Sequence, residues 1–367
     1  MIDPRIDKLA RILVNYSLQL KDGDLFMINA IDLAAPLVRA VFYEALLAGA
    51  HPYLKINLDG IAEILYKTAS EDQLQFISEI QKLEIEKVDA MLTVLGTYNT
   101  RNLSSIDPGR VALQQKAGLP QRKRFLERIA AKQLKWCATQ FPTQAAAQEA
   151  DMSLTEYEDF LFDACAVDDD DPVGHWLAQS AEQDRVINFL KTVDQIHIKN
   201  ADTDLKFRVK DRIWVNCSGH ENFPDGEIFT APLEDSVEGT IRFTWPAIYH
   251  GREVQDVRLT FEQGQVVKAE AAKGMAFLKS MLEADDGAST VGEFAFGMNK
   301  GIKQFTKNTL FDEKIGGTLH LALGASLPES GGQNISAIHW DMVCDMREGG
   351  EVSADGEVIY RNGDFVI

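Results

Sequence analysis

The stretch Leu25–Leu58, LFMINAIDLAAPLVRAVFYEALLAGAHPYLKINL, decides the fold of the first half of the chain. It starts with the short apolar run Leu25–Ala30, which is typical of a buried strand. Apolar residues then recur at helical spacing over Leu37–Leu46, and Gly49 ends this helix. Pro52–Leu58 supplies a second strand. A strand–helix–strand unit of this kind predicts two parallel strands joined by a right-handed crossover.

The same alternation continues after this unit. A helical pattern around Asp72–Leu83 leads to Ala90–Gly96, which is typical of a third buried strand. The segment Arg122–Cys165 is rich in Ala, Gln, Lys and Glu, and we expect it to be helical. The first half is therefore predicted to be an open α/β layer built on a parallel sheet.

Four adjacent aspartates, Asp168–Asp171, interrupt the helical pattern. They suggest a calcium loop, but the EF-hand spacing with its central glycine is absent, so we interpret them as a solvated loop. The helix that follows, from Gly174 to about Thr192, leads into a second half with the composition of strands and hairpins. Asp-Gly and Asn-Gly turns within Val352–Phe365 predict a β-meander at the end of this sequence.

We place the domain boundary near residue 190. Residues 1–190 are expected to form the N-terminal α/β domain with its open parallel sheet. Residues 191–367 are expected to form a mixed α+β, strand-rich domain. No internal repeat or low-complexity linker is evident.

The chain is acidic, because 56 Asp and Glu residues against 37 Lys and Arg residues give a formal net charge of −19. Such a field repels phosphate backbones and anionic lipid, so we expect neither nucleic acid nor a membrane as partner. The charged first turn lacks the apolar segment of a signal peptide, and we find no run of ~18 apolar residues. The four cysteines form no C-x-x-C pair and are interpreted as free thiols of a reducing compartment, the cytoplasm.

Several signatures of enzyme chemistry are absent. The sequence contains no H-E-x-x-H, no Walker loop, no G-x-S-x-G and no G-x-G-x-x-G after a strand. Zincin, nucleotide-dependent and serine-triad chemistry therefore have no anchor in it. The candidates that remain are carboxylates and imidazoles of the second half.

Each of these candidates occupies an unusual local sequence. Glu227 follows an Asp-Gly turn at the start of a strand-like run, where the alternative is a surface carboxylate at a strand end. Glu293 lies among apolar and glycine residues, and a carboxylate there must be exposed, paired or bound to a metal because burying it unpaired costs several kcal/mol. His320 lies in an apolar strand-like run, where the alternative is a core histidine hydrogen-bonded to the backbone.

The most informative segment is Ala337–Val343. His339 and Asp341 point to the same face of a strand, whereas Trp340 between them faces the other way. An imidazole and a carboxylate side by side suit zinc, cobalt or manganese. Together, two histidines and at least three acidic residues exceed the four ligands of one closed structural zinc site. They suit two adjacent metals that share a carboxylate bridge and activate water for hydrolysis.

Four blocks of the second half are FPDGEIFTAP (residues 223–232), GEFAFGMN (292–299), NTLFDEKIGGTLHLALG (308–324) and SAIHWDMV (336–343). In this order they resemble the signature blocks of the thermophilic-metalloprotease family of aminopeptidases, which includes aminopeptidases T and S. The stretches LARILVNYSLQLKDGDL (9–25) and APLVRAVFYEALLAGAHP (35–52) are also similar to the family. The resemblance therefore covers nearly the whole chain.

The resemblance implies an aminopeptidase that hydrolyses the N-terminal residue of short peptides with a dinuclear, metal-activated water. It implies two divalent metal ions per chain, such as cobalt, zinc, magnesium or manganese. It also implies a homodimer that encloses its active sites in an internal cavity. The positions that match the family's metal ligands are Glu227, Glu293, Glu313, His320, His339 and Asp341. Either Glu293 or Glu313 would accept the proton of the attacking water, and both alternatives stay open.

One position departs from the family pattern. Family members usually have a tyrosine seven residues after the histidine that matches His320, and here that position is Leu327. Leucine cannot donate a hydrogen bond to an oxyanion, and losing one such donor typically costs ~10²–10³-fold in turnover. Ser326 and Tyr360 are candidate replacements. Two other functions stay open: a metal-dependent amidase with a non-peptide substrate, and a metal-binding homologue that has lost catalysis.

Overall fold

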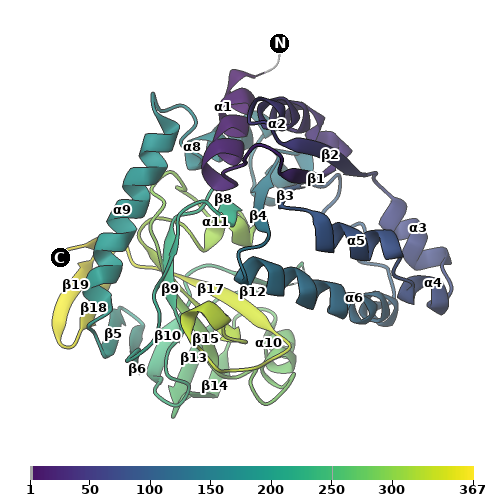
Figure 1. Ribbon diagram of the computed structural model, residues 1–367. Helices are drawn as coiled ribbons and strands as arrows, with labels where there is room; N and C mark the ends of the chain where they lie inside the picture. The colour runs from purple at the N-terminus through teal and green to yellow at the C-terminus, as the bar shows by residue number, and fades with distance from the viewer. Residues whose placement is uncertain (1–2, 250) are drawn as a thin grey trace. The chain divides into compact units, whose positions relative to one another are not determined.

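The computed structural model describes residues 3–249 and 251–367 (Figure 1). The chain divides into two compact units, the first comprising Met1–Val173 and Gly219–Phe223, the second Gly174–Ser218 and Pro224–Ile367. The sequence prediction divides the chain near residue 190, after helix α9 (Pro172–Leu190), and this helix lies in the second unit from Gly174 onward. Among the described residues, no helix is both long and apolar enough to cross a membrane.

The first unit is built on a sheet of five parallel strands in the order β2-β1-β3-β4-β8. The strands are β1 (Leu25–Ile31), β2 (His51–Asn57), β3 (Ala90–Leu95), β4 (Lys135–Gln140) and β8 (Asn222–Phe223). The helices are α1 (Pro4–Ile12), the π-helix η1 (Leu13–Ser17), the 3₁₀-helix η2 (Asp32–Ala34), α2 (Ala35–Leu47), α3 (Ile61–Thr68), α4 (Glu71–Gln75), α5 (Glu79–Lys87), α6 (Pro108–Ala130), α7 (Gln144–Glu149) and α8 (Leu154–Ala164). The predicted parallel, open α/β sheet is confirmed.

Two segments of this unit differ from the sequence prediction. The segment Arg122–Cys165 contains strand β4, which pairs with β3 on one side and β8 on the other. Its pairing partners outweigh a composition that favours helix, because strand formation depends strongly on context. The single helix expected around Asp72–Leu83 is two helices. Ser78 starts the second one, since its hydroxyl accepts a hydrogen bond from the backbone N–H of Gln81.

The second unit contains two large antiparallel sheets and a two-stranded ribbon, β11-β12. One sheet has eight strands in the order β14-β13-β10-β6-β5-β18-β19-β20, and the other has five in the order β17-β16-β15-β9-β7. The strands are β5 (Gln195–Asn200), β6 (Thr203–Arg208), β7 (Val215–Cys217), β9 (Glu227–Thr230), β10 (Glu238–Arg242), β11 (Ala247–Tyr249), β12 (Arg252–Val254), β13 (Arg258–Glu262), β14 (Gln265–Glu270), β15 (Val291–Gly297), β16 (Thr318–Gly324), β17 (His339–Asp345), β18 (Glu351–Ala354), β19 (Glu357–Arg361) and β20 (Asp364–Phe365). Besides α9, the helices are α10 (Met275–Leu282), α11 (Thr309–Asp312) and the 3₁₀-helix η3 (Pro328–Ser330). The predicted strand-rich, mixed α+β character of the second half is confirmed.

One hydrophobic core joins the two large sheets. Phe207 of the eight-stranded sheet packs edge-on against Phe294 of the five-stranded sheet, with ring centroids 4.8 Å apart. Along β15, β16 and β17, alternate residues face this core, as Phe294 and Phe296 do on β15. The residues between them face the opposite side of the sheet.

The last strands form the predicted β-meander, which is yellow in Figure 1. β18 pairs with β19 and β19 with β20, both antiparallel. The two turns, Asp355–Gly356 and Asn362–Gly363, have positive φ at both residues, as two-residue hairpin turns require. These strands complete the eight-stranded sheet on the far side of the core.

Candidate metal centre

The face of the five-stranded sheet that points away from the hydrophobic core carries most of the predicted site residues. Strands β9, β15, β16 and β17 lie side by side. Because side chains alternate along a strand, Phe294 points into the core whereas Glu293 points away from it. The same alternation turns His320 and Asp341 to this face. The residues concerned are Glu227 on β9, Glu293 on β15, His320 on β16, and His339 and Asp341 on β17.

These side chains converge above neighbouring strands. Nε2 of His320 lies 3.2 Å from Oε1 of Glu293 and 3.7 Å from Oε2 of Glu227. Nε2 of His339 lies 3.4 Å from Oε2 of Glu293 and 3.5 Å from Oδ1 of Asp341. Glu293 therefore lies between the two imidazoles and presents one oxygen to each.

Four groups among the described residues have possible ligand atoms within 4.8 Å of one another, and three of them are made of the predicted residues alone. These three are Glu227, Glu293 and His320; Glu293, His339 and Asp341; and Glu313, His320 and Asp341. The first two groups share Glu293. Glu313 follows the short helix α11 and approaches the cluster from a loop. The structure thus brings all six predicted residues together, and their role as ligands stays a prediction.

A β-bulge in β15 sets the position of Glu293. The register between β15 and β16 shifts between Val291 and Glu293, so Gly292 is an extra residue in its strand. A Cβ atom at Gly292 would collide with the carbonyl oxygens of Gly324 and Ala325. Only glycine fits this close approach of two backbones.

Each histidine is oriented by a backbone carbonyl. Nδ1–H of His320 donates to the carbonyl of Glu313 at 3.0 Å, and Nδ1–H of His339 donates to that of Ala325 at 2.7 Å. The hydrogen lies on Nδ1 because a carbonyl can only accept. In a neutral ring, Nε2 then presents a lone pair to the carboxylates. This arrangement is favourable only when a proton or a metal ion lies between them.

Burial and crowding shift the pKa values of the cluster. Burial raises the pKa of Glu227 to about 8, although a neighbouring ammonium opposes this. Burial alone would lower the pKa of His320. The hydrogen bond with Glu293 and the charges of the nearby carboxylates outweigh this effect and raise the pKa to about 9. For His339 the nearby carboxylates of Asp341 and Glu293 likewise outweigh burial and raise the pKa to about 12. The cluster therefore attracts positive charge strongly.

Lys314 belongs to the cluster but was not among the predicted residues. Its fully buried ammonium lies 3.2 Å from Oε1 of Glu227 and 3.8 Å from Oδ1 of Asp225, and it also pairs with Glu313. Asp225 is fully buried as well. The sequence signal for Lys314 is its position between the candidate ligand Glu313 and the apolar Ile315. A lysine in such a segment indicates a buried ammonium that is paired with carboxylates.

The charges and donor atoms of the cluster fit a metal centre. With neutral imidazoles, one ammonium and the carboxylates of Asp225, Glu227, Glu293, Glu313 and Asp341 leave four negative charges uncompensated. A protein interior tolerates such a charge only when cations compensate it. The Oε2 atoms of Glu227 and Glu293 are buried, and neither has a hydrogen-bond partner among the described residues. Carboxylate and imidazole donors suit zinc, cobalt or manganese.

Tyr360 does not replace the family's tyrosine. Its ring is buried in the hydrophobic core against Phe296, on the face of the sheet opposite to Glu293. The hypothesis that it acts at the site is therefore wrong, because β19 belongs to the eight-stranded sheet across the core. Ser326 lies next to Leu327, and within the described chain its buried Oγ has no hydrogen-bond partner. A role for Ser326 stays a prediction.

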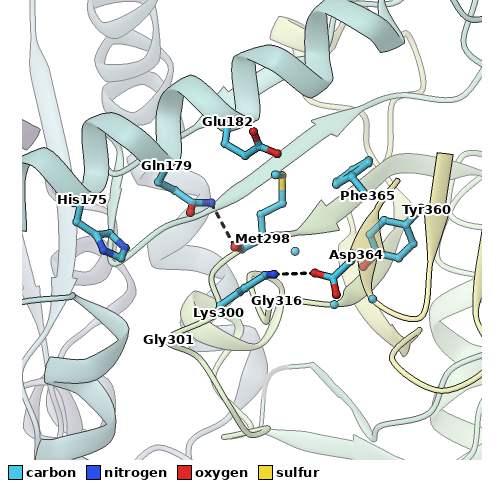
Figure 2. Close-up of a pocket in the computed structure, with 13 residues that line it drawn as sticks. His175, Gln179, Glu182, Met298, Lys300, Gly301, Gly316, Tyr360, Asp364 and Phe365 are labelled. Carbon is cyan, nitrogen blue, oxygen red and sulfur yellow. Dashed lines mark hydrogen bonds and ion pairs between the residues drawn. The ribbon is translucent and has the colours of Figure 1, made fainter. Parts of the chain in front are cut away.

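A cavity of about 350 Å³ elsewhere in the second unit is lined by none of the six predicted residues (Figure 2). Figure 2 shows two interactions among the polar groups that line it. Nε2 of Gln179 donates to the carbonyl of Met298 at 3.2 Å, and Lys300 pairs with Asp364 at 2.6 Å. The cluster of carboxylates and imidazoles thus lies on the sheet face and not in this cavity.

A buried cluster of carboxylates and imidazoles with two overlapping ligand groups is the kind of site that defines metal-dependent hydrolases. The family model described as thermophilic metalloprotease (M29) matches residues 2–365, and the chain belongs to this family. The resemblance read from the sequence blocks is thereby confirmed. The chain is an enzyme of a family of hydrolases that act on peptide bonds.

Relatives that match over nearly their whole length are named as aminopeptidases. Aminopeptidase 2 of Geobacillus stearothermophilus is 29% identical, with 100% of this chain and 98% of the relative covered. Aminopeptidase AmpS of Bacillus subtilis (strain 168) is 28% identical, with 99% and 98% covered. The solved structure of wild-type AmpT from Thermus thermophilus matches with a TM-score of 0.88 at 24% identity and covers 100% of both chains, which shows a shared fold.

Proposed function

We propose that this protein is a metal-dependent aminopeptidase that removes the N-terminal residue from short peptides. The observation that carries the proposal is the position of Glu293. Its two carboxylate oxygens lie 3.2 Å and 3.4 Å from different imidazoles, which supports a carboxylate that two metal ions would share. The relatives named as aminopeptidases support the peptide substrate.

Two divalent ions would match the four uncompensated charges of the cluster. Glu227, Glu293 and His320 would hold one ion, and Glu293, His339 and Asp341 the other. The chemistry that bound ions supply is Lewis-acid activation of water and of the scissile carbonyl. Cobalt, zinc, manganese and magnesium are the candidate ions.

Glu313 is the proposed proton acceptor. Each oxygen of Glu293 lies beside a different imidazole, so neither oxygen is available to accept a proton from water. Glu313 instead has a carboxylate oxygen within 4.8 Å of possible ligand atoms of His320 and Asp341. Burial raises the pKa of Glu313. A raised pKa favours a carboxylate that takes up a proton near neutral pH. Its pair with Lys314 fixes the orientation of the carboxylate.

The substrate's first residue and its free amine distinguish this function from its alternatives. The test uses metal-stripped protein with aminoacyl and N-acetylated aminoacyl substrates, and cobalt, zinc, manganese or magnesium is added back one at a time. We expect metal-restored cleavage of the free-amine substrates alone. Equal cleavage of both sets, or of a non-peptide amide only, would indicate an amidase. Stoichiometric metal uptake with no cleavage would indicate a homologue impaired at Leu327.

A homodimer and a cytoplasmic location complete the proposal. The family resemblance supports the dimer, which the mass of the native particle tests against the 40.9 kDa of one chain. None of the four cysteines, all of which lie among the described residues, forms a disulfide, and this supports a reducing compartment. Cell fractionation with an antibody against the protein tests this location.

A further inference from the structure

Beside the ligand cluster lies a small recess of about 20 Å³. Glu313 and Asp341 line it, so a molecule whose reacting bond lies at the cluster can extend into it. Much of the remaining wall is apolar and includes Ile248, Phe305 and Val343. All of these residues belong to the second unit.

Neighbouring groups hold this apolar wall in place. Val343 lies on β17 two residues after Asp341, and alternation turns both side chains to the same face. Strand β11, which carries Ile248, packs against β17. Phe305 stacks on Trp245, with ring centroids 5.5 Å apart and an interplanar angle of 21°. A substrate therefore has to fit the recess as it stands.

We propose that the recess receives the side chain of the peptide's first residue and selects small aliphatic side chains, of the size of alanine or valine. The inference rests on the proposed aminopeptidase function. A volume of about 20 Å³ is little more than the ~10–15 Å³ that a single water molecule needs, so the recess has room only for a small side chain. A larger side chain has to displace Val343 or Phe305, and both are held by their neighbours.

Charged groups also line the recess, so a charged side chain is the competing occupant. Oδ1 of Asp312 already accepts hydrogen bonds from the backbone N–H and the hydroxyl of Thr306, at 2.7 Å and 2.8 Å. Glu313 pairs with Lys314. A lysine or arginine side chain is also too long for the volume available. Lys307 lines the recess and would favour glutamate, so glutamate belongs in the test.

The test measures kcat/KM on aminoacyl p-nitroanilides of alanine, valine, leucine, phenylalanine, glutamate and lysine. Val343→Ala enlarges the recess and is expected to raise the leucine-to-alanine ratio ~10-fold or more. Val343→Ile fills it and is expected to lower the valine-to-alanine ratio by a similar factor. One methylene in an apolar pocket changes specificity ~10–200-fold. Val267→Ala, at an exposed position on β14, is the matched control and should leave both ratios unchanged.

Unchanged ratios in both Val343 variants would overturn the inference, and so would a wild-type preference for phenylalanine, glutamate or lysine. If no aminoacyl substrate is cleaved at all, the proposed function fails, and the recess is then judged by binding. Calorimetry on the zinc-loaded protein would rank alanine hydroxamate against leucine hydroxamate. The inference predicts that Val343→Ala shifts this ranking toward leucine, and an unshifted ranking would refute it. Circular dichroism identifies any variant that fails to fold.

Discussion

The two faces of the five-stranded sheet are made by the same strands but differ in polarity and charge. The core face carries Phe294 and Phe296, and the opposite face, called the ligand face below, carries the candidate ligands Glu293 and His320. Phe294 is fully buried on the core face among other aromatic rings. Glu293, one residue earlier, is only 4% exposed on the ligand face. Burial of Phe294 stabilises the folded state by removing apolar surface from water, whereas burial of Glu293 costs desolvation of a charge. The core face therefore supplies stability that offsets the cost of burying the carboxylates on the other face.

The largest expected effect comes from Glu293→Gln, which removes the shared carboxylate of the ligand face. We expect kcat/KM to fall by at least ~10²–10³-fold, since charge stabilisation at the reacting centre is lost. Elemental analysis should show reduced metal content. Wild-type protein should gain ~2.7 kcal/mol in the free energy of unfolding at a free metal concentration 100 times Kd, and the variant should gain much less. Full activity with full metal content would refute the bridging role.

Phe294→Ala tests the core face one residue away. Truncating a buried phenylalanine typically lowers the free energy of unfolding by ~3–5 kcal/mol. The metal content of the folded protein should stay that of the wild type. Denaturant titration measures the loss, and Phe76→Ala, at a side chain that is 72% exposed, is the control that should change stability little. A clear loss of metal from the folded variant would show that the two faces are not separate in function.

Gly292→Ala, the smallest change, tests the bulge that separates the two faces. The new methyl group meets two backbone carbonyl oxygens, and such overpacking typically costs ~1–3 kcal/mol. Because the bulge positions Glu293, kcat/KM should fall as well. Gly118→Ala in helix α6 is the matched control, since a Cβ there meets no atom within 4 Å. Equal stability and activity of the two variants would mean that the bulge does not position the carboxylate.

Local sequence predicts those parts of the fold that local chemistry decides. The strand–helix–strand unit around Leu25–Leu58 and the meander follow from periodicity and from turn residues such as Asn362. Strand β4 does not follow, because its stability comes from pairing with β3 and β8, which the segment itself does not encode. Ser78 shows the opposite case, since Ser78 and Gln81 form a capping box, a local signal in the sequence that marks the start of the second helix.

The candidate site was predictable to a similar extent. The shared face of His339 and Asp341 follows from their spacing alone. That Glu293 and His320 meet them depends on the order of β15, β16 and β17 in the sheet, and family resemblance supplied this knowledge where spacing did not. Tyr360 shows the limit of such reasoning, because nothing in its own segment reveals on which side of the core β19 lies.

The buried ammonium of Lys314 has a consequence for the order in which the enzyme matures. It pairs with the carboxylates of both Glu227 and Glu313. A classical zinc finger is unfolded until its ion binds, because the ion alone gathers its ligands. Here a permanent cation from the chain's own sequence holds part of the ligand cluster, so folding can finish first and metal loading can come last. Any metal ions would then be exchangeable in the folded protein, and supply and affinity, rather than folding, would set their identity.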